Sequence, residues 1–307
     1  MDELVDLWER PMAEEIYMIA GWHQWADAGS ISSGLPQHLI DETGAEKIGE
    51  IKPHGFYMFQ IPGTHHLLRP VIKLNDGYRE SLTFPQNEIY YWGNDERGLV
   101  IFLGHEPHIS VDRYAEAFFN MVQMLNVKRV AAVGGVYGAM PYDKERDVSC
   151  TYSLRSMKSE LDQYALRFSN YEGGSTIGSY LLDRAEEEEI EYLTFNAFVP
   201  AYDLSQISSQ LQGIQIENDF KAWYDLMRRF NHMFGLGIDL SGLSQQSEEL
   251  AASMKTKIEE LSRRVSSFNV QEFMDRLNED FTERTFMPLS DVWEEGLGDL
   301  LDDLGND

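Results

Sequence analysis

Four short segments of the sequence gather the side chains that acid–base or ligand chemistry uses, and each follows an apolar run that predicts a buried strand. They read GWHQWADAGS (residues 21–30), GHEP (104–107), GGVYGAMPYDKERD (134–147) and VPAYD (199–203). Carboxylates and imidazoles such as Asp27, His105 and Glu106 can carry protons, and Arg146 can bind an anion. Because ligands of parallel α/β sheets bind outside the carboxyl ends of the strands, we expect these segments to share one edge.

Each of these residues also has a purely structural interpretation. Asp27 could accept hydrogen bonds from backbone N–H groups at the start of a helix instead of facing a ligand. His105 and Glu106 are adjacent, so in an extended stretch their side chains point to opposite sides, which argues against a shared metal site. Trp22 and Trp25 could pack in the core or anchor an interface. The sequence therefore leaves open whether this edge reacts, binds or only folds.

Glycine-rich segments offer a second kind of site, for anions. GGVYGAMP matches neither the dinucleotide pattern GxGxxG nor the phosphate-binding pattern GxxxxGK[ST], although Arg146 follows it closely. YEGGSTIGSYLL (171–182) leads into a predicted helix, whose free N–H groups could bind phosphate or carboxylate. No GxSxG nucleophile elbow occurs, and Cys150 has the pattern of a buried thiol. No complete catalytic constellation can be read from the sequence.

Alternating strand and helix patterns position these segments between residues 15 and about 203. The expected strands are Glu15–Ala20, Lys47–Ile51, Phe56–Phe59, Val71–Leu74, Glu88–Trp92, Gly98–Leu103, Arg129–Val133 and Tyr192–Val199. The expected helices are Ser30–Glu42, Val111–Asn126, Leu154–Arg167 and Thr176–Glu189. The succession of strand, helix and strand predicts a mostly parallel sheet flanked by helices.

The last third of the chain has a different pattern, because the strand signal stops after about residue 204 and helical periodicity takes over. We therefore divide the chain into an α/β core domain, residues 1–240, and a helical C-terminal extension with an acidic tail, residues 241–307. The tail could be a loosely docked helix or a partner-binding segment.

The charge of the chain limits its partners. The formal net charge is −27, which repels phosphate backbones and anionic lipid surfaces, so we expect neither nucleic acid nor membrane as a partner. A basic protein or a cation fits better, although the acidity could serve solubility alone. The acidic N-terminus lacks the plan of a signal peptide and no long apolar run occurs, so a cytoplasmic location is expected.

Six segments in order resemble the motifs of the proteasome assembly chaperone 2 (PAC2) family, over about residues 16–240. They are AGWHQWADAGS (20–30), RP (69–70), FLGHEP (102–107), VGGVYGAMP (133–141), YEGGSTIGSYLL (171–182) and VPAY (199–202). The resemblance implies a three-layer α/β/α core like that of nucleoside phosphorylases, assembly into homo-oligomers, and binding of proteasome subunits without ATP. Chaperone members often end in a hydrophobic–tyrosine–any tripeptide that enters pockets of the proteasome ring, whereas this chain ends in Gly305-Asn306-Asp307.

Together these observations predict a non-enzymatic, ATP-independent protein of the chaperone type that binds protein partners and forms a homo-oligomer, such as a trimer. Proteasome-like subunits are one candidate class of partner. The alternative is a small-molecule-binding protein or a hydrolase- or phosphorylase-like enzyme that uses the strand-end cleft. No cofactor, metal or catalytic residue is assigned. The candidate ligand- or partner-binding residues are Trp22, Asp27, Arg69, His105, Glu106, Gly134, Gly135, Arg146, Gly173, Gly174 and Tyr202.

Overall fold

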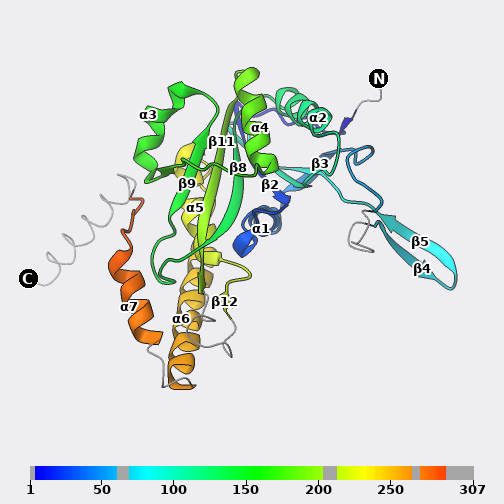
Figure 1. Ribbon diagram of the computed structural model, residues 1–307. Coiled ribbons are helices and arrows are strands. Elements are labelled where there is room, and N and C mark those ends of the chain that lie inside the picture. Colours follow the sequence, from blue (N-terminus) through cyan, green and yellow to red (C-terminus); the bar gives the residue numbers. More distant parts are fainter. Residues whose placement is uncertain (1–3, 61–68, 203–212, 265–269, 288–307) are drawn as a thin grey trace, which may run out of the picture.

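A mixed ten-stranded sheet forms the centre of the molecule in the computed structural model, which describes residues 4–60, 69–202, 213–264 and 270–287 (Figure 1). Its strands follow the order β1-β3-β6-β7-β2-β8-β11-β9-β10, with β12 paired to β11. The four central strands are parallel: β7 (Arg97–His105), β2 (Glu15–His23), β8 (Val127–Gly138) and β11 (Glu191–Tyr202). The others are β1 (Val5–Leu7), β3 (Glu46–Ile51), β6 (Glu88–Gly93), β9 (Val148–Tyr152), β10 (Arg167–Phe168) and β12 (Ile214–Gln215).

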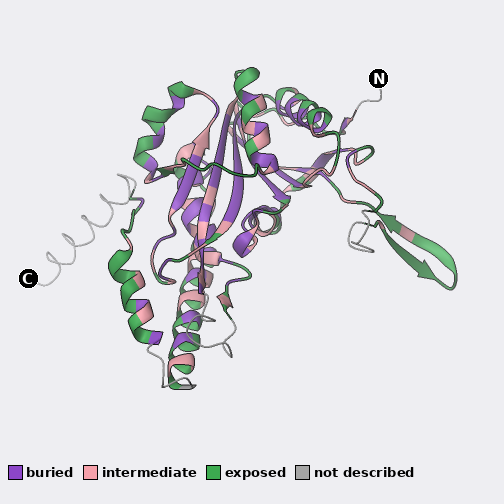
Figure 2. Cartoon of the chain, viewed as in Figure 1, coloured by how far each residue is buried: buried purple, intermediate pink, exposed green. Residues whose placement is uncertain are grey.

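Helices cover both faces of this sheet, so the fold has the three α/β/α layers that the sequence predicts. The helices α2 (Val111–Met124) and α4 (Ile177–Glu187) enclose one apolar cluster with one face. The helices α1 (Gly34–Thr43) and α5 (Phe220–Phe234) enclose the second cluster with the other face. Figure 2 shows the central strands buried between these layers. The near-continuous apolar sequence of the central strands follows from this two-sided burial.

The C-terminal helices extend the second cluster. Helix α6 (Ser241–Arg264) packs against α5, and α7 (Val270–Asp280) follows it. The chain then returns to the body, where Phe286 is buried and its N–H donates to the carboxylate of Glu145 at 3.1 Å. The domain boundary at residue 240 stays a prediction, and the acidic tail beyond residue 287 lies outside the described residues. None of the described helices is both long and apolar enough to cross a membrane.

Two of the expected elements are wrong. Leu154–Arg167 is not one helix: only α3 (Lys158–Leu161) is α-helical, with short 3-10 turns on either side, and Ala165 ends the segment at a φ of 52°. Met157, Leu161 and Tyr164 are buried in the core at spacings of three and four residues. Short helical turns produce this spacing without forming one continuous helix. Phe56–Phe59 is a turn, and Phe56 is buried with its ring edge-on to Tyr114 at 5.2 Å. Aromatic residues there fill the core without pairing as a strand.

A separate two-stranded hairpin projects from the body between β3 and β6 (Figure 1). It consists of β4 (Val71–Asn75) and β5 (Tyr78–Thr83), which pair only with each other. Asp76 and Gly77 turn the chain with φ of 48° and 79°, the two positive values that a tight hairpin turn needs. The sequence predicts β4 but not β5. We call residues 69–84 the arm.

Candidate functional site

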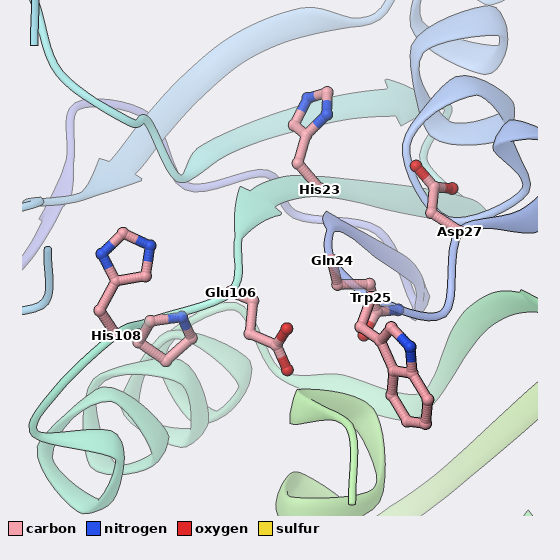
Figure 3. Close-up of a pocket in the computed structure, with 7 residues that line it drawn as sticks. His23, Gln24, Trp25, Asp27, Glu106 and His108 are labelled. Atoms are coloured by element: carbon pink, nitrogen blue, oxygen red, sulfur yellow. The ribbon is translucent and has the colours of Figure 1, made fainter. Parts of the chain in front are cut away.

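A pocket of about 420 Å³ lies at the carboxyl ends of β2 and β7, two neighbouring strands whose following helices lie on opposite faces of the sheet. The chain leaves β2 for α1 on one face and leaves β7 for α2 on the other, so a crevice forms between the carboxyl ends of these two adjacent strands. Its lining residues come from the segments that follow β2 and β7 (Figure 3): His23, Gln24, Trp25, Asp27, Glu106, Pro107 and His108. We call this site the carboxyl-edge pocket.

Asp27 holds the turn between β2 and α1. Its Oδ1 accepts the backbone N–H groups of Ser32 and Ser33 at 2.8 and 3.0 Å, and its Oδ2 accepts the Ser33 hydroxyl at 2.6 Å. Burial raises the pKa of Asp27, and these hydrogen bonds oppose the rise. The carboxylate therefore borders the pocket while it accepts three hydrogen bonds from Ser32 and Ser33 of its own turn.

Glu106 takes the same role at the start of α4. Its Oε1 accepts the N–H of Ile177 at 3.0 Å, and the Thr176 hydroxyl accepts the N–H of Ser179 at 3.2 Å. The helix N-terminus that the sequence suggested for an exogenous anion is thus filled by a carboxylate of the chain. Gly173 and Gly174 lie in the exposed turn before it.

Three histidines surround the entrance of the pocket. His23 and His105 are paired in register at the ends of β2 and β7, so their rings approach to 4.5 Å between centroids. Partial burial lowers the pKa of His23, and repulsion from His105 lowers it further. Burial also lowers the pKa of His108, whose Nδ1 accepts the N–H of Met58 at 3.2 Å. His105 Nδ1 donates to the Gln86 carbonyl at 3.0 Å. The lowered pKa values of His23 and His108 disfavour the charged form of these two side chains and so weaken the attraction of the pocket for anions.

Asn87, just before β6, connects the end of β7 to the buried tyrosines of the core. It is not among the residues predicted from the sequence. Its Oδ1 accepts the hydroxyls of Tyr57 and Tyr114 at 2.8 and 3.1 Å and the N–H of His105 at 3.1 Å. Trp22 is completely buried and donates its indole N–H to Tyr114 at 2.9 Å. Trp22 is therefore a core residue that supports the pocket from below. A single asparagine after Pro85 carries no sequence signal for such a hub.

Arg146 does not line the carboxyl-edge pocket. It is buried and binds both carboxylate oxygens of Asp219, at 2.8 and 3.1 Å, while its remaining N–H groups donate to the carbonyls of Tyr142 and Lys144. Next to it, Arg229 binds Glu145 at 2.8 Å. We call these residues, with Asp225, the charge network. The guanidinium predicted to meet an external anion is instead paired with Asp219 inside the protein.

The other candidate residues have mainly structural contacts. Gly134 and Gly135 lie in β8, and a Cβ on Gly135 would stand 1.9 Å from the Ala28 carbonyl oxygen, so glycine lets the turn after β2 cross the strand. Tyr202 is buried and donates to the Met140 carbonyl at 2.9 Å. Arg69 lies at the base of the arm, bonded to Gln60 and stacked on the Phe59 ring at 4.7 Å.

The structure therefore brings together only part of the predicted set. Asp27 and Glu106 meet at the pocket with His105 beside it, whereas Arg69, Arg146 and Tyr202 are not among its lining residues. Within the described ranges, no group of three or more His, Cys, Asp or Glu side chains is arranged to hold a metal ion. The carboxylates that could act as bases are engaged by backbone N–H groups. Among the lining residues, Trp25 has 72% of its surface exposed, and His23 is exposed as well.

Comparisons with known proteins agree with the fold. A proteasome-assembly chaperone homologue of Mycobacterium tuberculosis superposes with a TM-score of 0.65 at 23% identity, covering 78% of this chain and 94% of its own. A PAC2 family protein of Streptomyces avermitilis gives 0.66 at 22% identity, covering 84% and 99%. PbaB of Pyrococcus furiosus, an archaeal proteasome activator, gives 0.58 at 19% identity, covering 84% and 100%.

A comparison with curated proteins found no match. The model of the PAC2 family, by contrast, matches residues 21–258, which include the turn after β2, the whole carboxyl-edge pocket, the charge network and most of α6. The order of motifs and the three-layer fold agree with that match, and the chain belongs to the PAC2 family.

Proposed function

We propose that the protein binds other proteins and assists their assembly, without catalysis and without ATP. Family membership supports a chaperone-like role in general, and similar structures include a proteasome-assembly chaperone homologue and an archaeal proteasome activator. One observation carries the proposal to this chain. Both pocket carboxylates are engaged by backbone N–H groups of the chain's own turns and helices, while a tryptophan stands exposed at the rim.

Trp25 has the features of a protein-binding anchor. A tryptophan buried on binding contributes more free energy than most other side chains, and such anchors sit in or beside pockets. Three further large side chains are exposed near the same edge: Ile109 follows β7, Tyr137 lies in the last part of β8, and Tyr171 precedes α4. Aromatic side chains are enriched in the buried cores of protein–protein interfaces, so their exposure here favours an interface at this edge.

The net charge of −27 indicates the kind of partner. Opposite charge on the partner would speed the encounter and exclude acidic competitors, so we propose a partner with a basic docking surface. Proteasome-like subunits are the partner class that the relatives suggest. We also propose that the protein acts in the cytoplasm as a homo-oligomer.

Substitution of Trp25 tests this function. We expect Trp25→Ala to weaken binding of the partner by more than about tenfold, because the indole is exposed and free to be buried by it. The matched control is Trp8→Ala, which removes another exposed tryptophan beside the edge strand β1. Native mass spectrometry of the chain purified from its own host identifies the partner, and titration of the pure partner measures affinity with and without ATP. Equal affinity for wild type and Trp25→Ala would overturn the assignment.

The alternative function is binding of a small molecule in the carboxyl-edge pocket, and the volume of about 420 Å³ favours it. A thermal-shift screen with nucleosides, phosphates and divalent metals decides between the two. A ligand of the pocket raises the melting temperature by linkage, and Trp25→Ala or Glu106→Gln would reduce that rise. A protein-binding edge instead gives no shift with any of the three classes.

A further inference from the structure

We infer that the arm is an interaction element that packs against the acidic body of a second copy of this chain. The inference deepens the proposed function, because it rests on the homo-oligomer and names the surface that forms it. Figure 1 shows the arm projecting from the body, and Figure 2 shows almost all of it exposed.

The pairing of the hairpin sorts its side chains onto two unlike faces. Ile72 is paired with Leu82, and Leu74 lies two residues along the same strand, so these three side chains share one face. They are between 42% and 57% exposed. The opposite face carries three pairs of mixed character: Lys73 with Ser81, Val71 with Thr83, and Asn75 with Tyr78. A sheet with one apolar face and one mixed, polar face is patterned for burial on one side.

Nothing in the described parts of the chain covers that apolar face. Among the described strands, β4 and β5 pair only with each other. A lone two-stranded hairpin is at best marginally stable in water and needs a further strand or a packed surface to be firmly ordered. The Lys73–Glu80 ion pair at 2.9 Å lies in solvent and adds little stability. No described residue of the chain supplies that support.

The charge of the arm indicates what that support is. Residues 69–84 contain three basic and two acidic side chains, a net charge of +1, so the other residues of the chain carry −28. Arg79 lies opposite Leu74 on the apolar face, and no ion pair joins it to another described residue. A cation among exposed aliphatic side chains fits an acidic surface, and the nearest abundant acidic surface is the body of another copy.

A second copy also explains how so acidic a chain could associate. Two bodies of the same sign repel each other, whereas the paired strands of the arm, residues 71–83, reach out from the body with two basic and two acidic residues and thus no excess of negative charge (Figure 1). An arm that docks on a neighbour's body uses two different surfaces, which makes the contact heterologous and closes into a ring when the rotation permits. The arm thus supplies an apolar contact and, in Arg79, a cation for the acidic body of the neighbour.

The test compares three variants by analytical ultracentrifugation and native mass spectrometry at micromolar concentrations. The triple variant Ile72→Ser, Leu74→Ser and Leu82→Ser removes the apolar face, and we expect its dissociation constant to rise more than about tenfold. Its matched control, Val71→Ser with Tyr78→Ser, removes exposed apolar groups from the same hairpin and should leave association close to wild type. Arg79→Glu should weaken association and reduce its dependence on salt.

The outcomes separate this inference from the proposed function. An unchanged oligomer in the triple variant, or an equal loss in the control, overturns the arm as the interface while leaving partner binding through Trp25 untouched. A monomeric wild type overturns both the homo-oligomer and the arm. If the arm docks on a different protein instead, the wild type is a monomer on its own and forms a complex with that protein. The triple variant then loses this complex. The melting temperature of each variant checks that the body is still folded.

Discussion

Asp27 in the carboxyl-edge pocket and Asp219 in the charge network do the same local task in different surroundings. Asp27 accepts N–H groups before α1, and Asp219 accepts the N–H of Ala222 at the start of α5. Asp219 is completely buried and also binds Arg146, whereas Asp27 is partly exposed and no ion pair to it is found among the described residues. Both sites thus contain a carboxylate that caps a helix. In the charge network this carboxylate also pairs with Arg146, whereas in the pocket it borders the open crevice.

That difference teaches how to interpret charged residues at a sheet edge. Residue type alone put Asp27 and Arg146 in one cleft, since both follow central strands. In the folded chain, Arg146 turns beneath the start of α5 and Asp27 stays at the open crevice. A charged side chain deep in the protein must be paired, so its partners are internal and its role is structural. The groups that remain in contact with solvent are the ones free to meet a ligand or partner.

The largest expected effect is in the charge network. Arg146→Met leaves Asp219 buried without its cation, and we expect a loss of about 3–5 kcal/mol of unfolding free energy in urea titrations. The control is Arg167→Met, which removes an exposed arginine paired with Asp147 and should cost less than about 1 kcal/mol. Equal losses for the two arginines would mean that the buried ion pair of Arg146 contributes no more to stability than the exposed ion pair of Arg167.

A smaller loss is expected in the pocket. Asp27→Ala removes three hydrogen bonds that hold the turn before α1, and we expect about 2 kcal/mol of destabilisation in the same titrations. Asp41→Ala changes an exposed aspartate on α1 and should alter stability by less than about 0.5 kcal/mol. If Asp27→Ala were as stable as this control, the carboxylate would be free for chemistry in the pocket.

The sequence predicts the layers and the edge well because both depend on local patterns. Buried parallel strands are apolar throughout, and helices repeat their apolar residues every three or four positions, so β2, β7, β8, β11 and their helices could be located. Short edge strands such as β1, β10 and β12 could not, since two or three residues carry no period.

The site was only partly predictable because its contacts join distant segments. The link from Glu106 to Ile177 spans 71 residues, and the link from Arg146 to Asp219 spans 73. Spacing along the chain cannot report such pairs. Asn87 and His108 were missed for the same reason, although the segment GHEP ends one residue before His108.

The smallest expected effect is a change in how stability depends on pH. Burial raises the pKa of Asp225 to about 6, so the folded state binds its proton more tightly than the unfolded state does. The stability that this proton provides is complete below about pH 4 and is lost as the pH rises through about 6. In Asp225→Asn the amide oxygen can still accept the N–H of Arg146, and no charge forms. The variant should therefore gain about 1 to 2 kcal/mol relative to wild type between pH 4 and pH 7.

The control for this pH dependence is Asp183→Asn on the exposed side of α4, whose unfolding free energy should run parallel to wild type across the same range. If the unfolding free energy of Asp225→Asn also ran parallel to wild type, ionisation of Asp225 would not destabilise the fold. The charge network would then tolerate an ionised carboxylate as readily as the open pocket does. A curve that diverges only for Asp225→Asn shows instead that burial, more than residue type, separates the two sites.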